Sequence, residues 1–140
     1  MTAQFLTDLI VRDDDGRHMT LHAPLKFYSA QRKGSFIAPE GFQTDFASIP
    51  RGFWNLIPKN GKWDKAAVMH DAAYRGELQT PTGRKVHLIK AYADDLFYEA
   101  MRASGVNAVT ATLMYKAVSW FGGSAYKAGQ RVEKATEIHR

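Results

Sequence analysis

Hydrophobic and polar residues follow two different spacings along this chain. In the first part, turn-forming residues separate short, partly alternating apolar runs such as QFLTDLIV, RHMTLHA and LKFYSA. This pattern is typical of short strands, and the acidic segment DDDG at 13–16 predicts the loop of a β-hairpin between two of them. Residues 1–40 are therefore expected to be mainly β-structure.

Residues 41–61 show neither spacing clearly. The string GFQTDFASIPRGFWNLIPKNG holds four aromatic residues, two prolines and three glycines. Aromatic side chains gain free energy when they pack away from water. An irregular segment rich in them is therefore expected to be an ordered loop and not a flexible linker.

Helical spacing begins just after this loop. Apolar residues recur every three or four positions in three stretches, at about 63–75, 86–103 and 107–121. The third stretch is apolar on most sides, which predicts the central helix of the group. Residues 62–126 are thus the expected helical core, and a weak helix with a basic tail is expected over 127–140.

Strands followed by helices predict an α+β fold, and 140 residues suit a single domain. The first two helices are joined by the ten-residue segment GELQTPTGRK. Because a linker of this length lets the chain reverse direction, the first two helices are expected to pack antiparallel.

Candidate chemistry centres on the stretch AAVMHDAAY at 66–74. On a helix, His70 and Tyr74 lie four residues apart and share a face, while Asp71 points to the adjoining side. The alanines around His70 leave room beside its imidazole. This arrangement is the first indication of a polar site.

The second helix carries the carboxylates that could complete this site. Antiparallel packing would place Asp94 and Asp95 opposite His70. A carboxylate that holds one imidazole nitrogen leaves the other nitrogen free to take a proton from water, as a general base does. The sequence thus nominates His70 and Asp94 as catalytic residues, with Tyr74 and Asp95 in support.

The same residues also have a purely structural interpretation. A histidine on a helix is more often a satisfied structural group than a catalyst, and His-Asp pairs arise by chance. His70, Asp71 and Asp94 could therefore form a buried, fully hydrogen-bonded knot that locks the 41–61 loop onto the helices. Spacing alone leaves both interpretations open.

A second polar cluster lies in the loop sequence TDFASIPR. Short polar side chains such as Asp45 and Ser48 commonly cap turns, and Arg51 is the other charged group there. Thr44, Ser48 and Arg51 are therefore expected to belong to a loop with a binding or structural role. If the cluster has a further role, Asp45 and Asp71 could be carboxylate ligands of a divalent cation such as calcium.

Composition narrows the range of functions. The chain has no cysteine, which excludes disulfides, thiolate metal sites and cysteine nucleophiles. The net charge of +5 is spread over both halves without a recognisable nucleic-acid-binding module, so no specific nucleic acid partner is expected. No apolar run is long enough to span a membrane and no signal peptide is visible, which predicts synthesis in the cytoplasm.

Three strings carry a family resemblance: GFQTDFASIPR at 41–51, AAVMHDAAY at 66–74 and ADDLFYEAM at 93–101. Together they resemble a family of short bacteriophage and prophage proteins that is defined as a domain of unknown function. The resemblance covers about residues 25–126. It implies a phage setting, in which the protein is made in the host cytoplasm and could be incorporated in the virion.

A second, local resemblance is chemical. HDAAY followed by ADDLF is similar to the pattern of secreted phospholipase A2, in which a His-Asp pair on one helix faces an aspartate on an antiparallel helix. It implies that His70 activates water, Asp71 binds calcium, Asp94 orients the imidazole and Tyr74 supports it. The cysteines of that family are absent, and only Gly52 stands where its glycine-rich calcium loop would be.

Three hypotheses follow from these patterns. The first is a small hydrolase that acts on an ester of the host envelope. The second is a virion or tail-associated structural protein in which the polar residues form the buried knot. The third is a metal-dependent phosphohydrolase that uses Asp45, His70, Asp71 and Asp94. Other virion proteins or host-envelope lipid are the expected partners.

Overall fold

The structure is a computed structural model that describes residues 1–13, 18–46, 48–50, 52–53 and 62–138, with side chains to residue 130. In this part of the chain, six short strands precede four helices, which confirms the predicted α+β fold. The strands are β1 (Gln4–Phe5), β2 (Val11–Asp13), β3 (Met19–Leu21), β4 (Leu25–Ser29), β5 (Gly34–Ala38) and β6 (Gln43–Thr44). The helices are α1 (Asp64–Tyr74), α2 (Lys90–Ala103), α3 (Ala108–Phe121) and α4 (Gly123–Ile138).

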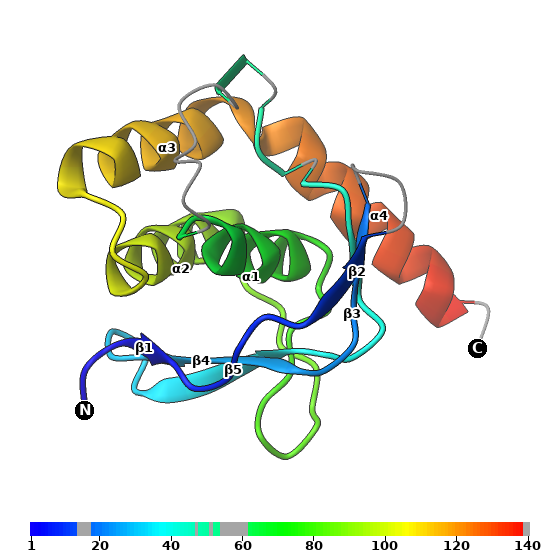
Figure 1. The fold of residues 1–140 in the computed structure, drawn as a ribbon. Helices are drawn as coiled ribbons and strands as arrows, with labels where there is room; N and C mark the ends of the chain where they lie inside the picture. The colour runs from blue at the N-terminus through cyan, green and yellow to red at the C-terminus, as the bar shows by residue number, and fades with distance from the viewer. Residues whose placement is uncertain (14–17, 47, 51, 54–61, 139–140) are drawn as a thin grey trace.

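The strands form two antiparallel sheets, with the orders β1-β4-β5 and β2-β3-β6. The predicted hairpin joins β2 to β3, although most of its turn lies outside the described residues. In β4, alternate residues point inward, so that Leu25 and Phe27 are fully buried while Lys26 faces solvent. Figure 1 shows the β1-β4-β5 sheet below the pair α1 and α2, which cover its apolar face.

Helix α1 is the centre of the molecule. Every residue from Ala66 to Tyr74 is buried, because the small alanines let neighbouring elements approach on all sides.

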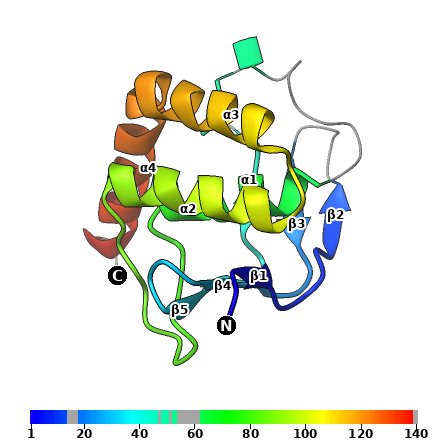
Figure 2. The ribbon, with the colours of Figure 1, turned by 90° about the vertical axis from the view of Figure 1, so that its left-hand side faces the viewer.

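The prediction that 107–121 forms the central helix is wrong. Helix α3 lies on the side of the α1–α2 pair opposite the β1-β4-β5 sheet, as Figure 2 shows. Its outer face exposes several large apolar side chains, namely Val109, Leu113, Trp120 and Phe121.

Helices α1 and α2 pack antiparallel, as the linker length predicted. Tyr74 at the end of α1 contacts Asp94 near the start of α2. Gly105, just after α2, lies beside the side chain of Lys62, just before α1. This orientation brings the polar residues of the two helices face to face.

Helix α4 runs to Ile138, so it is longer than the weak helix predicted at 127–140. It is fixed to α1 by a hydrogen bond of 2.9 Å from Gln130 Nε2 to the carbonyl oxygen of Tyr74. A Cβ at Gly129 would lie 2.4 Å from that same oxygen, so the two helices meet at a glycine. No helix in the described residues has the length and apolarity needed to cross a lipid bilayer.

The predicted ordered loop at 41–61 is described only in part. Strand β6 lies within it and pairs with β3, while Ile49 is buried in the core. Residues 47, 51 and 54–61 lie outside the described part of the chain. The described portion therefore reaches from the second sheet to the surface of α1.

The contact between α4 and α1 predicts the effect of one small substitution. Gly129→Ala should lower the free energy of unfolding by about 2 kcal/mol, because the new methyl group meets backbone that cannot rotate away. Gly123→Ala is the matched control, since a Cβ there meets nothing within 4 Å. Urea unfolding of the two variants should separate them, and equal stabilities would contradict the close helix approach.

Candidate functional site

The imidazole of His70 lies between α1 and α2 and is fully buried. Its Nε2 is 2.8 Å from Oδ1 of Asp94, which is the contact predicted from the helix spacing. The ring of Phe97 packs against it with a centroid separation of 4.6 Å. The imidazole is thus held both by a carboxylate and by an aromatic neighbour.

The carboxylate of Asp94 receives two further donors. The hydroxyl of Tyr74 donates to Oδ1 at 2.6 Å, as expected from the placement of Tyr74 on the face of His70. Lys90 Nζ donates to Oδ2 at 2.8 Å, so both carboxylate oxygens have partners. Sequence reasoning missed Lys90, although its position four residues before Asp94 is a spacing that favours ion pairs on a helix.

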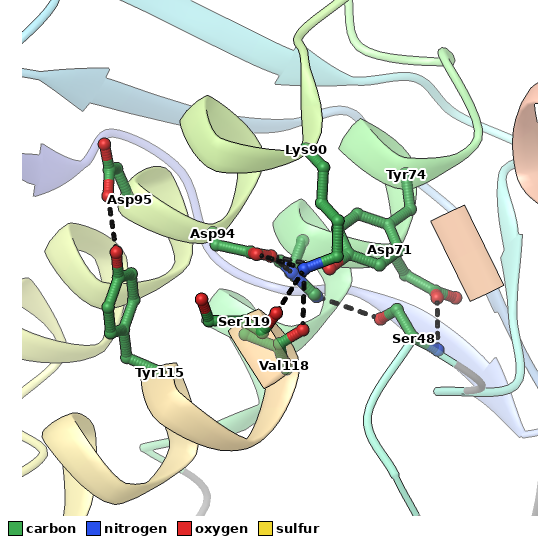
Figure 3. Close-up of polar contacts among 10 residues, drawn as sticks. Ser48, Asp71, Tyr74, Lys90, Asp94, Asp95, Tyr115, Val118 and Ser119 are labelled. Carbon is green, nitrogen blue, oxygen red and sulfur yellow. Dashed lines mark hydrogen bonds and ion pairs between the residues drawn. The ribbon is translucent and has the colours of Figure 1, made fainter. Parts of the chain in front are cut away.

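Lys90 also ties a third helix to this carboxylate. Its Nζ donates to the carbonyl oxygens of Val118, at 2.8 Å, and Ser119, at 3.1 Å. These carbonyls belong to the last turn of α3, where the helix dipole favours a positive charge. Figure 3 shows the ammonium group between Asp94 and the end of α3.

The second imidazole nitrogen faces the loop. Nδ1 of His70 is 3.0 Å from Oγ of Ser48. Because the acceptor Asp94 requires a proton on Nε2, a neutral ring carries no proton on Nδ1. In that tautomer the Ser48 hydroxyl donates to Nδ1. The sequence had placed Ser48 only among loop-stabilising residues.

Burial and charge fix the protonation states of this pair. Burial lowers the pKa of His70 below its usual 6.5 and outweighs the opposite effect of the Asp94 carboxylate. Burial also opposes the ionisation of Asp94, but hydrogen bonds from His70, Lys90 and Tyr74 prevail and hold its pKa below 3.8. At neutral pH the site therefore contains a neutral imidazole and an ionised Asp94.

Asp71 faces the loop instead of α2. Its Oδ2 accepts a short hydrogen bond from the Thr44 hydroxyl, and its Oδ1 accepts one of 3.3 Å from the backbone N–H of Ser48. Only 2% of Asp71 is exposed. The Thr44 hydroxyl and the backbone of Ser48 thus tie the loop to α1.

The expected metal ligands are engaged elsewhere. Asp45 accepts a hydrogen bond of 3.2 Å from Arg75, a residue that sequence reasoning did not single out. Asp71 is held by its loop donors, and both nitrogens of His70 have partners. Among the described residues, no three acidic or histidine side chains converge on a point where a cation could bind.

The structure corrects the expected place of Asp95. Its carboxylate accepts a hydrogen bond of 3.2 Å from the hydroxyl of Tyr115 in α3. Figure 3 shows this pair apart from the network around Asp94. Adjacent helix residues point in different directions, so only one of the two aspartates can face His70. Arg51, which was predicted to belong to a loop with a binding or structural role, lies outside the described residues.

A cavity of about 360 Å³ adjoins the loop side of this network. Four polar residues line one side of it, namely Ser48, Asp71, Tyr74 and Arg75. Small residues of α4 line the other, namely Ala125, Ala128 and Gly129. The cavity thus touches the residue that is hydrogen-bonded to Nδ1 of His70. A neutral imidazole between a carboxylate and a hydroxyl, beside such a cavity, has the components of general-base catalysis.

Comparison with known proteins gives a family but no activity. The chain is 40% identical over 86 residues to an uncharacterised protein, y4jT, from Sinorhizobium fredii. The match covers 60% of this chain and 23% of that relative, so the chain spans about a quarter of its length. No solved structure matches the chain.

The family match covers the elements that build the site. Residues 19–118, which include β3 to β6, α1, α2 and most of α3, match a family described as proteins of unknown function, DUF1353. Thr44, Ser48, His70, Asp71 and Asp94 all fall within this range. Because the match extends over more than half of the chain, the protein belongs to the DUF1353 family.

Proposed function

We propose that this protein is a small hydrolase of carboxylic esters in which His70 is the general base. One observation carries the proposal: the buried imidazole lies between the Asp94 carboxylate, at 2.8 Å, and the Ser48 hydroxyl, at 3.0 Å. The hydrogen bond to Asp94 fixes the proton on Nε2 and leaves Nδ1 as the basic nitrogen. Nδ1 faces Ser48, which is one of the residues that line the cavity.

The surroundings of His70 favour this role in two ways. Its lowered pKa keeps the ring neutral, and hence able to accept a proton, at neutral pH. Asp94, held by Tyr74 and Lys90, stabilises the imidazolium that forms when Nδ1 takes up a proton. Asp94, Tyr74 and Lys90 are thus positioning residues.

The local resemblance to phospholipase A2 supports the same conclusion. That resemblance implied a His-Asp pair on one helix, an aspartate on an antiparallel helix and a tyrosine that supports the aspartate. His70, Asp94 and Tyr74 have these relations here. For the substrate we propose an ester of the bacterial envelope, in keeping with the phage and prophage setting that the sequence indicated.

The calcium that this resemblance implied does not fit the described residues. Asp71 is occupied by Thr44 and by the backbone of Ser48, and Asp45 pairs with Arg75. A cation at Asp71 would have to displace the donors that hold the loop. The chemistry proposed here is therefore derived from the side chains of the chain itself. No observation in the described residues favours the metal-dependent phosphohydrolase hypothesis.

A second candidate function is that of a structural component of a phage particle. The observation in its favour is the burial of the network, since His70 is fully buried and only 2% of Asp94 is exposed. Both imidazole nitrogens and both Asp94 oxygens have partners, as a structural knot requires. Large apolar side chains on the outer face of α3, such as Trp120 at 71% exposure, would then contact another virion protein.

The hydrolase proposal is tested by replacing the base. His70→Ala should lower kcat/KM for a short-chain nitrophenyl ester by at least about 100-fold, because general-base catalysis is lost. His22→Ala is the matched control, since His22 has an exposed side chain just after β3 and its replacement should leave kcat/KM unchanged. Circular dichroism at the assay temperature establishes that both variants are folded.

Two results would contradict this proposal. One is full ester hydrolysis by folded His70→Ala protein. The other is the lack of any ester hydrolysis by the parent protein together with a large loss of stability in Asp94→Asn. Removal of one partner from a buried charged pair costs about 3–5 kcal/mol, so that second result would favour the structural candidate.

The lowered pKa of His70 gives a pH dependence with a definite sign. Only the neutral imidazole accepts a proton, so kcat/KM should fall on acidification with an inflection below pH 6.5. In the unfolded chain the pKa of His70 is the ordinary 6.5, whereas in the folded protein it is lower. Below pH 6.5 the unfolded state therefore binds more protons, and the free energy of unfolding should also fall as the pH drops. A pH–rate profile with an inflection at or above 6.5 would contradict the buried, neutral base.

A further inference from the structure

We propose that Ser48 is the nucleophile of the reaction and that its Oγ forms a covalent acyl-enzyme with the ester substrate. This inference rests on the proposed hydrolase function, because it needs His70 as the base. It adds to that function the identity of the attacking group, which could otherwise be water.

The first argument is the position of the hydroxyl. Ser48 Oγ lies 3.0 Å from Nδ1 of His70, which is hydrogen-bond distance and the place where a nucleophile must lose its proton. The hydroxyl thus occupies the position at Nδ1 that an attacking water would otherwise take. Ser48 also lines the cavity of about 360 Å³, so the residue beside the base also borders a space for substrate.

The second argument is the direction of the proton. With Nε2–H donated to Asp94, the lone pair of Nδ1 accepts the Ser48 proton. Asp94 then stabilises the positive charge that develops on the ring. A serine hydroxyl is a weak nucleophile by itself, and this relay of three side chains is the usual means of activating it.

The third argument is that hydrogen bonds to Asp71 fix the loop around Ser48 to α1. Its backbone N–H donates to Asp71, which also accepts the Thr44 hydroxyl. Phe46, two residues earlier, has a φ of +59°, a conformation that residues with side chains rarely adopt. The Phe46 ring packs on Trp63 at a centroid separation of 5.3 Å, which keeps the chain in this conformation. Backbone held in such a conformation is frequent at functional sites, where it aims a side chain.

The proposed hydrolysis needs only Ser48, His70, the ester and water. Ser48 Oγ attacks the ester carbonyl carbon as its proton moves to Nδ1 of His70. The carbon–oxygen bond to the alcohol breaks, and the alcohol leaves with the proton from Nδ1. Water then attacks the acyl-serine, gives its proton to Nδ1, and releases the acid as the Ser48 hydroxyl regains that proton. The sum is ester plus water to acid plus alcohol, with no oxidant or reductant.

The cavity indicates the kind of ester. Its volume of about 360 Å³ is near the lower end of the range for ligand pockets, which suits a compact acyl group better than a long chain. Arg75 and Asp71 both line the cavity, and Arg75 is already paired with Asp45, so the lining favours neither sign of charge in the substrate. We therefore expect short-chain esters.

The test uses an alkyl fluorophosphonate, which loses fluoride to an activated serine and leaves a stable phosphonyl adduct. The parent protein should gain this adduct on the peptide that contains Ser48, as identified by mass spectrometry. Ser48→Ala should form no adduct at position 48, and its kcat/KM for ester hydrolysis should fall by at least about 100-fold. His70→Ala should keep the serine but label at least about 100-fold more slowly. Ser124→Ala is the matched control, since Ser124 is an exposed serine on α4.

The outcomes separate this inference from the proposed function. If Ser48→Ala is folded and still hydrolyses esters while His70→Ala does not, water is the nucleophile and only the assignment of Ser48 is overturned. If the parent protein neither labels at Ser48 nor hydrolyses esters, both proposals fail. Ser48→Cys guards against a folding defect in the alanine variant, because it keeps a nucleophile of similar size. After incubation with the nitrophenyl ester, an acyl-thioester at position 48 of this folded variant supports the assignment, and the absence of one overturns it.

Discussion

The rest of this structure depends on the hydrogen bonds and the ion pair that hold the ionised carboxylate of Asp94. An unpaired buried charge is very unfavourable, so the fold must supply donors to this one group. His70 and Tyr74 supply them from α1, and Lys90 supplies one from the start of α2. Since Lys90 also binds the last turn of α3, a single carboxylate connects three helices. The same requirement fixes the tautomer of His70, and so links stability to the proposed chemistry.

The parts of this arrangement that sequence could predict are those set by local periodicity. Helical spacing places His70 and Tyr74 on one face, and the length of the following linker indicated antiparallel packing. Together these two facts predict that the imidazole of His70 meets a carboxylate of the neighbouring pair Asp94 and Asp95, and the structure shows that Asp94 makes this contact. The alternation of apolar and polar residues in the first part of the chain likewise predicted short strands there. In β4, every second residue is buried, as such alternation requires. The DUF1353 match covers the same elements.

The remainder depends on contacts between distant segments, which spacing does not encode. The loop residue Ser48 meets His70 because the path of the chain after β6 places it there, and no periodic signal specifies that path. The apolar composition of α3 suggested a central position, yet α1 is central because its polar groups find partners within the molecule. Asp95 differs from Asp94 by a single position, and only packing decides which one faces the imidazole.

The proposed chemistry requires a neutral His70 with its proton on Nε2 and none on Nδ1. Nitrogen NMR of protein labelled in its histidine rings measures this state directly, with a His70→Ala sample to assign the signals. The expected result at neutral pH is one protonated and one unprotonated ring nitrogen for His70, with the proton on Nε2, the nitrogen that faces Asp94. Two protonated nitrogens at that pH, or a proton on Nδ1 alone, would contradict it.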